Sequence, residues 1–494
     1  MNRKALLAAC VVTAWVLGAC APVPPRPESV ATIASAKGIG LSKTRSIPWP
    51  AADWWRGYRD PQLERLIDDA LAGAPGVRLA AARLREADRR AELAAANAGV
   101  SLTLNGISSR ERNTGNGIIP PPFRGAMMTN SRLAIDFSME IDWWGRNRAL
   151  IESAIGQTLA AQADVAAARV MLASAIVQGY FQVQTDFRRL AVARAAVAVR
   201  EQLAALDEAR IARGLDTALV RRQREGEIAS GRLQIEVIQA GLALGLNQLA
   251  ALTGKAPGAM QPVAEAPIAD ALFASAGEVP VDLVGRRADI AASRWRVESA
   301  ARLEEAAVAQ FYPNLSLSAF AGFSAIGLVN VIRGSSGIYG VAPALHLPLF
   351  DSGRLAANLG VQRAQIDTAV EQYNQTLVDA VREAADQIAL LRSVAIQRER
   401  AEEGLTALRA LLDLSQARLD AGLADASQTL NVRLQLLAQE DALAALRGRQ
   451  LAADALLARA LGGGYGESTA GETNAGSTGA AAATGAGTAP VAAR

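Results

Sequence analysis

Cysteine, histidine and aromatic residues are scarce in this chain, and each scarcity narrows what the protein can do. The 494 residues include two cysteines and one histidine, and aromatic residues make up 4% of the sequence. A single histidine, His346, excludes a histidine-based metal site and an HExxH zinc motif, so enzymatic activity is not expected. The 51 basic and 48 acidic residues nearly balance, so no nucleic-acid partner is indicated.

Both cysteines lie in the first twenty residues, which read "MNRKALLAACVVTAWVLGAC". Arg3 and Lys4 precede an apolar run from Ala5 to Leu17, which is too short to span a bilayer and fits a secretory signal. The "LGAC" at its end resembles the lipobox of bacterial lipoproteins, although an ordinary signal peptide with a chance cysteine is the alternative. We therefore expect residues 1–19 to be removed, and we expect Cys20 to carry N-acyl and S-diacylglycerol lipid, with no other cofactor. The segment 20–60 would then hold the anchor and an extended, proline-rich start of the mature chain.

The chain contains a long internal sequence repeat. Gly145 and Gly353, Gly214 and Gly422, and Gly254 and Gly462 are each 208 positions apart, within similar local sequences. The first repeat covers residues 61–254 and the second 286–462, with a connector at 255–285. Residues 463–494 form a low-complexity tail that is expected to be disordered.

Each repeat contains a very long helix that ends at a glycine. No proline occurs between Pro122 and Pro257 or between Pro348 and Pro490, and apolar residues in the second of these stretches recur at spacings of three and four. Gly145 to Gly214 and Gly353 to Gly422 both span 69 residues, which corresponds to a helix of about 100 Å. Gly214 and Gly422 are therefore predicted to be the turns of two helical hairpins.

Four short segments alternate between apolar and polar residues, which predicts strands at about 100–110, 132–142, 314–324 and 339–350. Such strands fit either a soluble sheet or a membrane barrel. Four strands cannot close a barrel, and open edges in lipid would leave unpaired backbone groups. A barrel would thus need several chains: three copies give twelve strands and two give eight. The fold class expected is mostly α, with a small membrane β part.

The polar faces of these strands carry the candidate lumen residues Asp136, Glu140, Asp142 and His346. Three carboxylates at this spacing are compatible with acid–base catalysis or with cation binding. Because they share one strand face and lack other partners, we interpret them as an acidic barrel lining. His346 is interpreted as a residue that faces the lumen.

Four passages together carry a family resemblance: "WWRGYRDPQLERLIDDAL" (54–71), "PVDLVGRRADI" (280–290), "FYPNLSLSA" (311–319) and "PLFDSGR" (348–354). In this order they resemble the TolC family of outer-membrane efflux proteins, particularly its lipid-anchored, NodT-like type. The resemblance implies a homotrimer with a twelve-stranded barrel in outer-membrane lipid, continuous with a periplasmic helical barrel. It also implies an exit duct of a tripartite efflux pump, with a periplasmic adaptor and an inner-membrane transporter of the RND type as partners. A duct for type I secretion and a periplasmic coiled-coil lipoprotein without a pore are the alternatives.

One passage departs from the family pattern. Relatives place aspartates after the second turn glycine, where this chain has Gln428 and Asn431. We therefore expect the periplasmic gate to be closed by a hydrogen-bonded ring rather than by charges. Its candidate residues are Ser427, Gln428 and Asn431, with Asp425 and Arg433 near by.

Overall fold

The computed structural model describes residues 23–25, 32–33, 49–118, 120–267, 269–273 and 286–466. The predicted signal at 1–19, the lipidation site Cys20 and almost all of the tail at 463–494 lie outside the described residues. The chain divides into two compact units. The first unit contains Arg83–Ala161 and Ser293–Tyr373, together with the described residues up to Ile33, and the second contains Ala34–Ala82, Gln162–Ala292 and Asn374–Arg494.

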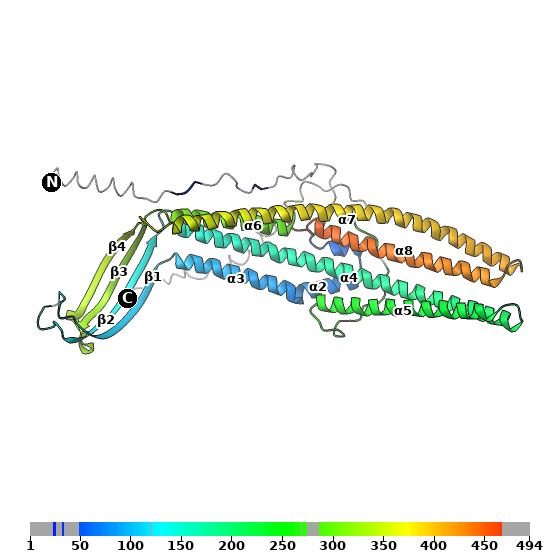
Figure 1. Ribbon diagram of the computed structural model, residues 1–494, viewed down its shortest axis with the longest axis horizontal. Coiled ribbons are helices and arrows are strands. Elements are labelled where there is room, and N and C mark those ends of the chain that lie inside the picture. Colours follow the sequence, from blue (N-terminus) through cyan, green and yellow to red (C-terminus); the bar gives the residue numbers. More distant parts are fainter. Residues whose placement is uncertain are drawn as a thin grey trace, which may run out of the picture. The chain divides into compact units, whose positions relative to one another are not determined.

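The first unit contains a four-stranded antiparallel sheet in the order β1-β2-β3-β4 (Figure 1). Its strands are β1 (Ser101–Arg112), β2 (Met127–Ile141), β3 (Asn314–Ile326) and β4 (Gly337–His346). Phe137 of β2 lies opposite Leu102 of β1 and Ala319 of β3, and Ala319 lies opposite Val341 of β4. Residues that face each other in a ladder share one face of the sheet, so the apolar faces predicted for the four strands coincide.

The fourth strand is shorter than the predicted 339–350 and ends at His346. Pro348 has no N–H to offer a ladder, and the residue before a proline is conformationally restricted, so pairing stops near this point. Pro343 is accommodated inside β4 because β4 is an edge strand of the sheet. The other three strands contain the predicted segments to within one residue at one end and extend beyond them at the other.

The helices of the first unit pack closely against one another. Helix α6 (Ala288–Ala309) approaches α4 (Arg146–Ala212) where a Cβ on Gly156 would lie 3.1 Å from the Cβ of Ser299. The hydroxyls of Ser153 and Ser299 are 2.9 Å apart at this contact. Beyond it, Ala307, Phe311, Leu355 and Leu359 form a buried apolar cluster between α6 and the start of α7 (Arg354–Asp420).

The second unit is helical. It contains η1 (Trp54–Tyr58), α2 (Pro61–Gly73), the start of α3 (Pro75–Asn97), most of α4 and α7, and two return helices, α5 (Ala218–Leu252) and α8 (Ala426–Ala460). Tyr180 and Phe181 of α4 are fully buried in its core. The buried carboxylate of Asp454 accepts hydrogen bonds from the Tyr58 hydroxyl and from the N–H groups of Leu272 and Phe273. Burial raises the pKa of Asp454, and this network joins α8 to two segments distant in sequence.

The two repeats have equal helix lengths. Helices α4 and α7 contain 67 residues each, and α5 and α8 contain 35 each. Figure 1 shows α5 returning beside α4, and α8 beside α7. The predicted fold class, mostly helical with four strands per chain, is confirmed.

By length and composition α4 and α5 would also be able to span a membrane, but only 33% and 17% of their most apolar windows are buried within the described chain.

Candidate functional site: the helical hairpin turns and the polar strand face

The first predicted turn lies between α4 and α5. Gly214 has a φ of 75°, a left-handed conformation that glycine adopts at little cost. The N–H of Leu215 donates to the Arg210 carbonyl at 2.9 Å, and the N–H of Gly214 donates to the Ile211 carbonyl at 2.9 Å. These two bonds satisfy carbonyls at the end of α4 in the manner of a Schellman motif.

The second turn, between α7 and α8, has the same geometry 208 residues later. Gly422 has a φ of 71°, and the N–H of Leu423 donates to the Arg418 carbonyl at 2.8 Å. Asp425 then caps α8, since its carboxylate accepts a hydrogen bond from the Ser427 N–H at 3.2 Å. Hydrogen bonds from Ser427 lower the pKa of the Asp425 carboxyl, so it is charged at neutral pH.

An arginine joins the two turns. The Nε of Arg210 lies 3.2 Å from the Asp216 carboxylate, in the turn that Arg210 itself precedes. Its Nη1 lies 3.3 Å from the carboxylate of Asp425 in the other turn. Asp425 was predicted to be a gate residue, but nothing in the sequence indicated Arg210 as its partner. One cation therefore holds an acidic residue of each hairpin.

The predicted ring residues do not bond to one another within one chain. Gln428, Asn431 and Arg433 are exposed, and their side chains form no hydrogen bond or ion pair within the part of the chain that the structure describes. Ser427 is half-buried and hydrogen-bonds to Asp425. The side-chain donors and acceptors of Gln428, Asn431 and Arg433 are therefore available to groups outside the chain. Arg221 and Arg222 differ in this respect, because each already pairs with a glutamate, Glu208 and Glu225, at 2.7 Å.

The first hairpin carries ion pairs that no spacing in the sequence indicated. Arg224 of α5 donates to Asp207 of α4 at 2.7 Å, and both side chains are largely buried, with exposed fractions of 18% and 9%. Arg221 donates through Nε and Nη2 to both oxygens of Glu208, at 2.8 and 2.7 Å. The partners are 13 and 17 positions apart, so only the folding of the hairpin brings them together.

On the polar face of the sheet, Asp136 does not stand alone. The guanidinium of Arg132, four residues earlier on the same face, contacts both oxygens of Asp136 at 2.5 and 3.1 Å. The Asn105 amide from β1 donates to it at 2.8 Å. The interpretation of this face as an acidic lining is therefore corrected at Asp136, because the charge is balanced locally by Arg132.

The other three candidate lumen residues lie at the same end of the sheet. Glu140 of β2 pairs with Arg146 of α4 at 3.2 Å. Asp142 follows the end of β2, and its carboxylate accepts hydrogen bonds from the N–H groups of Asn147 and Arg148, so it caps α4 rather than extending the strand face. His346, the last residue of β4, lies opposite Asn314. Glu140, Asp142 and His346 line a cavity of about 270 Å³.

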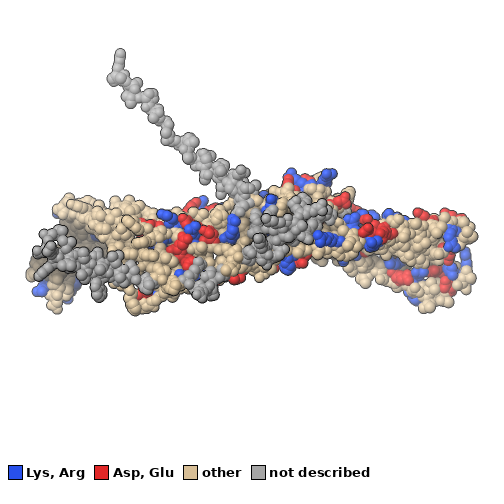
Figure 2. Space-filling view, turned by 90° about the horizontal axis from the view of Figure 1, so that it is seen from above, with Lys and Arg blue, Asp and Glu red and all other residues tan. Residues whose placement is uncertain are grey.

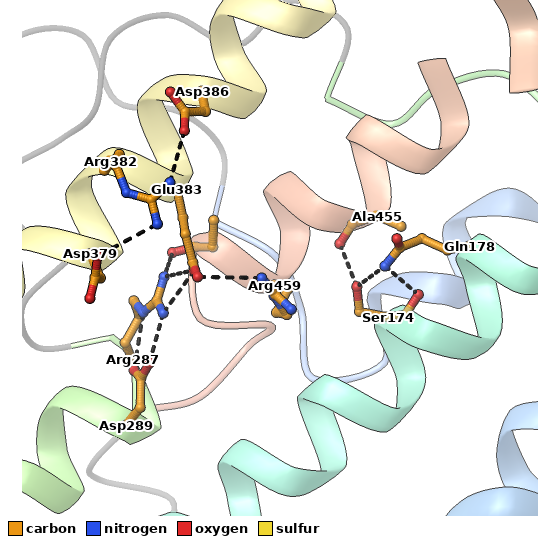
Figure 3. Close-up of polar contacts among 11 residues, drawn as sticks. Ser174, Gln178, Arg287, Asp289, Asp379, Arg382, Glu383, Asp386, Ala455 and Arg459 are labelled. Carbon is orange, nitrogen blue, oxygen red and sulfur yellow. Dashed lines mark hydrogen bonds and ion pairs between the residues drawn. The ribbon is translucent and has the colours of Figure 1, made fainter. Parts of the chain in front are cut away.

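A buried arginine fixes the start of the second repeat (Figure 3). Arg287, from the "GRRADI" passage, donates to Asp289 at 3.0 and 2.7 Å, to Glu383 of α7 twice at 3.2 Å, and to the Ala460 carbonyl at 3.1 Å. Arg459 approaches the same Glu383 at 3.5 Å. All five donors of Arg287 are used, so the residue joins α6, α7 and α8 and has none left for a ligand.

The distribution of charge agrees with the division between strands and helices. Figure 2 shows that acidic and basic side chains gather over the helices, whereas the strands present mainly uncharged residues on the face in view. A sheet with one exposed apolar face and, in the same chain, long helical hairpins that end in charged turns are typical of channel proteins of the bacterial outer membrane.

Comparisons with known proteins give the family. The family model for "Outer membrane efflux protein" matches residues 66–255 and 279–463, which coincide with the two repeats. The chain therefore belongs to the outer membrane efflux protein family, and it is an outer-membrane protein that serves efflux. The resemblance to the TolC family that its sequence indicated is confirmed.

Individual relatives cover most of their own length. The chain is 30% identical over 430 residues to the multidrug resistance outer membrane protein MdtP of Escherichia coli K12, covering 85% of this chain and 88% of that protein. It is 29% identical over 480 residues to MdtQ of Escherichia coli O157:H7, covering 94% and 100%. Among solved structures, VceC of Vibrio cholerae is 33% identical, with a TM-score of 0.76 and coverage of 85% of this chain and 100% of VceC.

Proposed function

We propose that three copies of this chain form one outer-membrane exit duct, through which a tripartite pump expels drugs or other small toxic molecules. The relatives MdtP and MdtQ are named as multidrug resistance proteins, which supports drugs as the substrate class. A periplasmic adaptor and an inner-membrane transporter of the RND type would complete the pump. The chain acts as a conduit in this proposal and catalyses no reaction of its own.

The sheet supports assembly from several chains. Its edge strands β1 and β4 have no partner on their outer sides among the described strands. The apolar face reaches both edges and is uncovered, with Leu104 of β1 68% exposed and Val341 of β4 71% exposed. An open apolar sheet in lipid would leave backbone groups unpaired, whereas pairing β4 of one copy with β1 of the next closes twelve strands into a barrel.

Aromatic residues at one end of the sheet support its placement in a membrane. Trp143 and Trp144 follow β2, Tyr312 precedes β3, and Phe350 follows β4. Trp144 stacks on Tyr312 with ring centroids 4.6 Å apart, while Trp143 and Phe350 are 75% and 87% exposed. Tryptophan and tyrosine gather at membrane–water interfaces, so this group would mark the periplasmic surface of the membrane.

The return helix α5 supports the same assembly in the second unit. Leu219, Leu233 and Leu244 are 76%, 66% and 69% exposed within one chain. In the proposed trimer, neighbouring copies would cover these side chains and complete a helical tunnel. Cys20 with its lipid would add an anchor to the barrel.

The gate would lie at the two hairpin turns. Around a threefold axis, the unpaired amides of Gln428 and Asn431 would meet those of neighbouring copies and close the tunnel by hydrogen bonds. Each such bond contributes only about 1 kcal/mol, so an adaptor would open the gate readily. Replacing both residues with Asp would crowd like charges together and weaken the closed state.

Conductance of the purified protein in planar bilayers tests the proposal. We expect single channels from the parent protein and a higher conductance from the Gln428→Asp/Asn431→Asp variant. The matched control replaces Gln234 and Gln435, exposed glutamines of the two return helices α5 and α8, with Asp. An assembled protein without channels would contradict the exit duct, whereas equal conductance of the two double variants would contradict only the gate.

Orientation of the sheet has a separate test. Ile135→Asp would place a charge on the lipid face of β2, at a cost of about 2–4 kcal/mol near the midplane, and should block insertion. Asp136→Asn at the next position should assemble. The reverse result would mean that the polar face meets the lipid.

A further inference from the structure

A short described stretch near the N-terminus, Val23–Pro25, contacts helices of the first unit at one site. Arg363 of α7 donates through Nη1 to the Pro25 carbonyl at 2.8 Å and through Nη2 to the Pro24 carbonyl at 3.0 Å. Val23 packs against the buried cluster of Ala307, Phe311, Leu355 and Leu359. We refer to Arg363 together with this cluster as the N-terminal seat.

A second partner, Glu304, orients the arginine without help from the segment. Its Nε donates to Glu304 of α6 at 2.9 Å, and both side chains are largely buried, with exposed fractions of 14% and 16%. This ion pair fixes the plane of the guanidinium and leaves Nη1 and Nη2 directed at the two carbonyls. Lysine at this position would offer a single point charge without the fork.

The sequence of the segment suits the seat. Pro24 and Pro25 have restricted backbones and no N–H groups, so the segment loses little conformational freedom on docking. Proline-rich chain forms no internal hydrogen bonds, and its carbonyls are available to an outside donor. Val23 packs on the buried cluster beside Val308 and so adds an apolar contact to the two hydrogen bonds.

We infer that the N-terminal seat is a binding site for the start of the mature chain, and that it fixes the place where the lipid anchor enters the membrane. Cys20 precedes Val23 by three residues, so an extended chain carries it at most about 10 Å from the seat. Leu355 of the seat comes five residues after Phe350, one of the aromatic residues assigned above to the periplasmic surface of the membrane. The seat thus holds the anchor at the level of the lipid. The anchoring step rests on the proposed lipidation of Cys20, whereas the docking step does not.

Thiol labelling tests the docking step in the assembled full-length protein. Val23→Cys is introduced, and its rate of reaction with a fluorescent maleimide is compared with the background of the protein without this substitution. We expect slow labelling in the parent and labelling about tenfold faster after Arg363→Ala, which removes two charge-assisted hydrogen bonds. The control is Arg382→Ala on the same helix, an exposed arginine that pairs with Asp379 and Asp386 and should change nothing.

A second variant tests docking without any change in α7. Pro24→Gly/Pro25→Gly leaves Arg363 and its surroundings intact, loosens only the bound segment and should also accelerate labelling. Unchanged rates in both Arg363→Ala and the double glycine variant would overturn the seat. If Arg363→Ala fails to assemble, the glycine variant alone decides.

The anchoring step has its own readout. Palmitate incorporation reports whether Cys20 is lipidated, and the amount of assembled protein in the outer membrane is measured for Arg363→Ala, Cys20→Ser and the combined variant. If the seat acts through the anchor, Arg363→Ala lowers assembly in the lipidated protein and has little further effect beside Cys20→Ser. Equal losses in both backgrounds would show that Arg363 only stabilises α7, and would overturn the anchoring step while leaving docking to the labelling test.

Discussion

The hairpin of α4 and α5 and the hairpin of α7 and α8 share their lengths and their turns, but different side chains join their helices. In the first hairpin Asp207 pairs with Arg224 and Glu208 with Arg221. At the equivalent positions, 208 residues later, the second hairpin has Ser415, Val432, Gln416 and Thr429. There the hydroxyls of Ser415 and Thr429 are 2.9 Å apart in a buried contact.

This difference shows that the backbone geometry of a hairpin and the side-chain contacts that join its two helices are separate properties. Equal helix lengths and a glycine at the turn give both hairpins the same length, whichever side chains join their helices. The side-chain contacts near each turn then decide how that hairpin responds to charge, salt and pH. The ion pairs near the first turn are sensitive to all three, whereas the contact between Ser415 and Thr429 near the second turn is sensitive to none of them directly.

The largest difference between the repeats is expected at the ends of the return helices. Gly462 has a φ of 95°, and a Cβ there would lie 1.8 Å from the Arg286 carbonyl oxygen. Gly254, its equivalent, has a φ of 74° and a nearest contact of 3.0 Å to the Gly73 carbonyl oxygen. Gly462→Ala should therefore cost more than about 4 kcal/mol and abolish folded protein, whereas Gly254→Ala should cost about 1–3 kcal/mol. Yield and thermal unfolding followed by circular dichroism measure both, and equal losses would contradict the difference.

The next largest effect is expected when the ion pair between Asp207 and Arg224 is broken. Arg224→Ala leaves the Asp207 carboxylate without its partner and should destabilise the first hairpin by about 1–3 kcal/mol. Asp207→Ser/Arg224→Val gives the first hairpin the residues of the second and should be nearly neutral, because both charges leave together. Amide hydrogen exchange of α4 and α5 near the turn measures each change. If the double variant is as unstable as Arg224→Ala, the uncharged residues of the second hairpin cannot replace this ion pair.

A smaller effect is expected in the second hairpin. Ser415→Ala removes one buried hydroxyl contact and should cost about 1 kcal/mol. The loss should appear as faster amide exchange in α7 and α8 near Gly422, with α4 and α5 unchanged. The matched control is Gln416→Ala, one residue along, whose side chain bonds only to Asp420 on the surface.

The smallest effect is a response to acid. Hydrogen bonding from Arg221 lowers the pKa of Glu208 below its ordinary value of 4.5. Its contribution to stability is therefore present above pH 4.5 and is lost as the pH falls through the lowered pKa. Gln416 at the equivalent position does not titrate. Amide exchange near Gly214 should rise on acidification, and it should rise less in Glu208→Gln, whose amide side chain does not titrate.

The sequence by itself determined the repeat, the helix lengths, the turn glycines and the faces of the strands. These features are periodic or local: a spacing of three and four, an alternation of two, a proline-free stretch and a glycine at its end. The end of β4 was placed four residues too late because the alternation continues past the last hydrogen bond of the ladder.

Only the tertiary structure decided which side chains meet. The contact of Arg210 with Asp425, the pairing of Asp207 with Arg224 and the seat formed by Arg363 all join residues on different elements. Such contacts depend on how far each helix is rotated about its axis toward its neighbour, and no spacing within one element encodes that rotation. Asp142 is the local example: its position suggested a strand face, but the turn into α4 directs its carboxylate to the free N–H groups at the helix start, where a negative charge is most favourable.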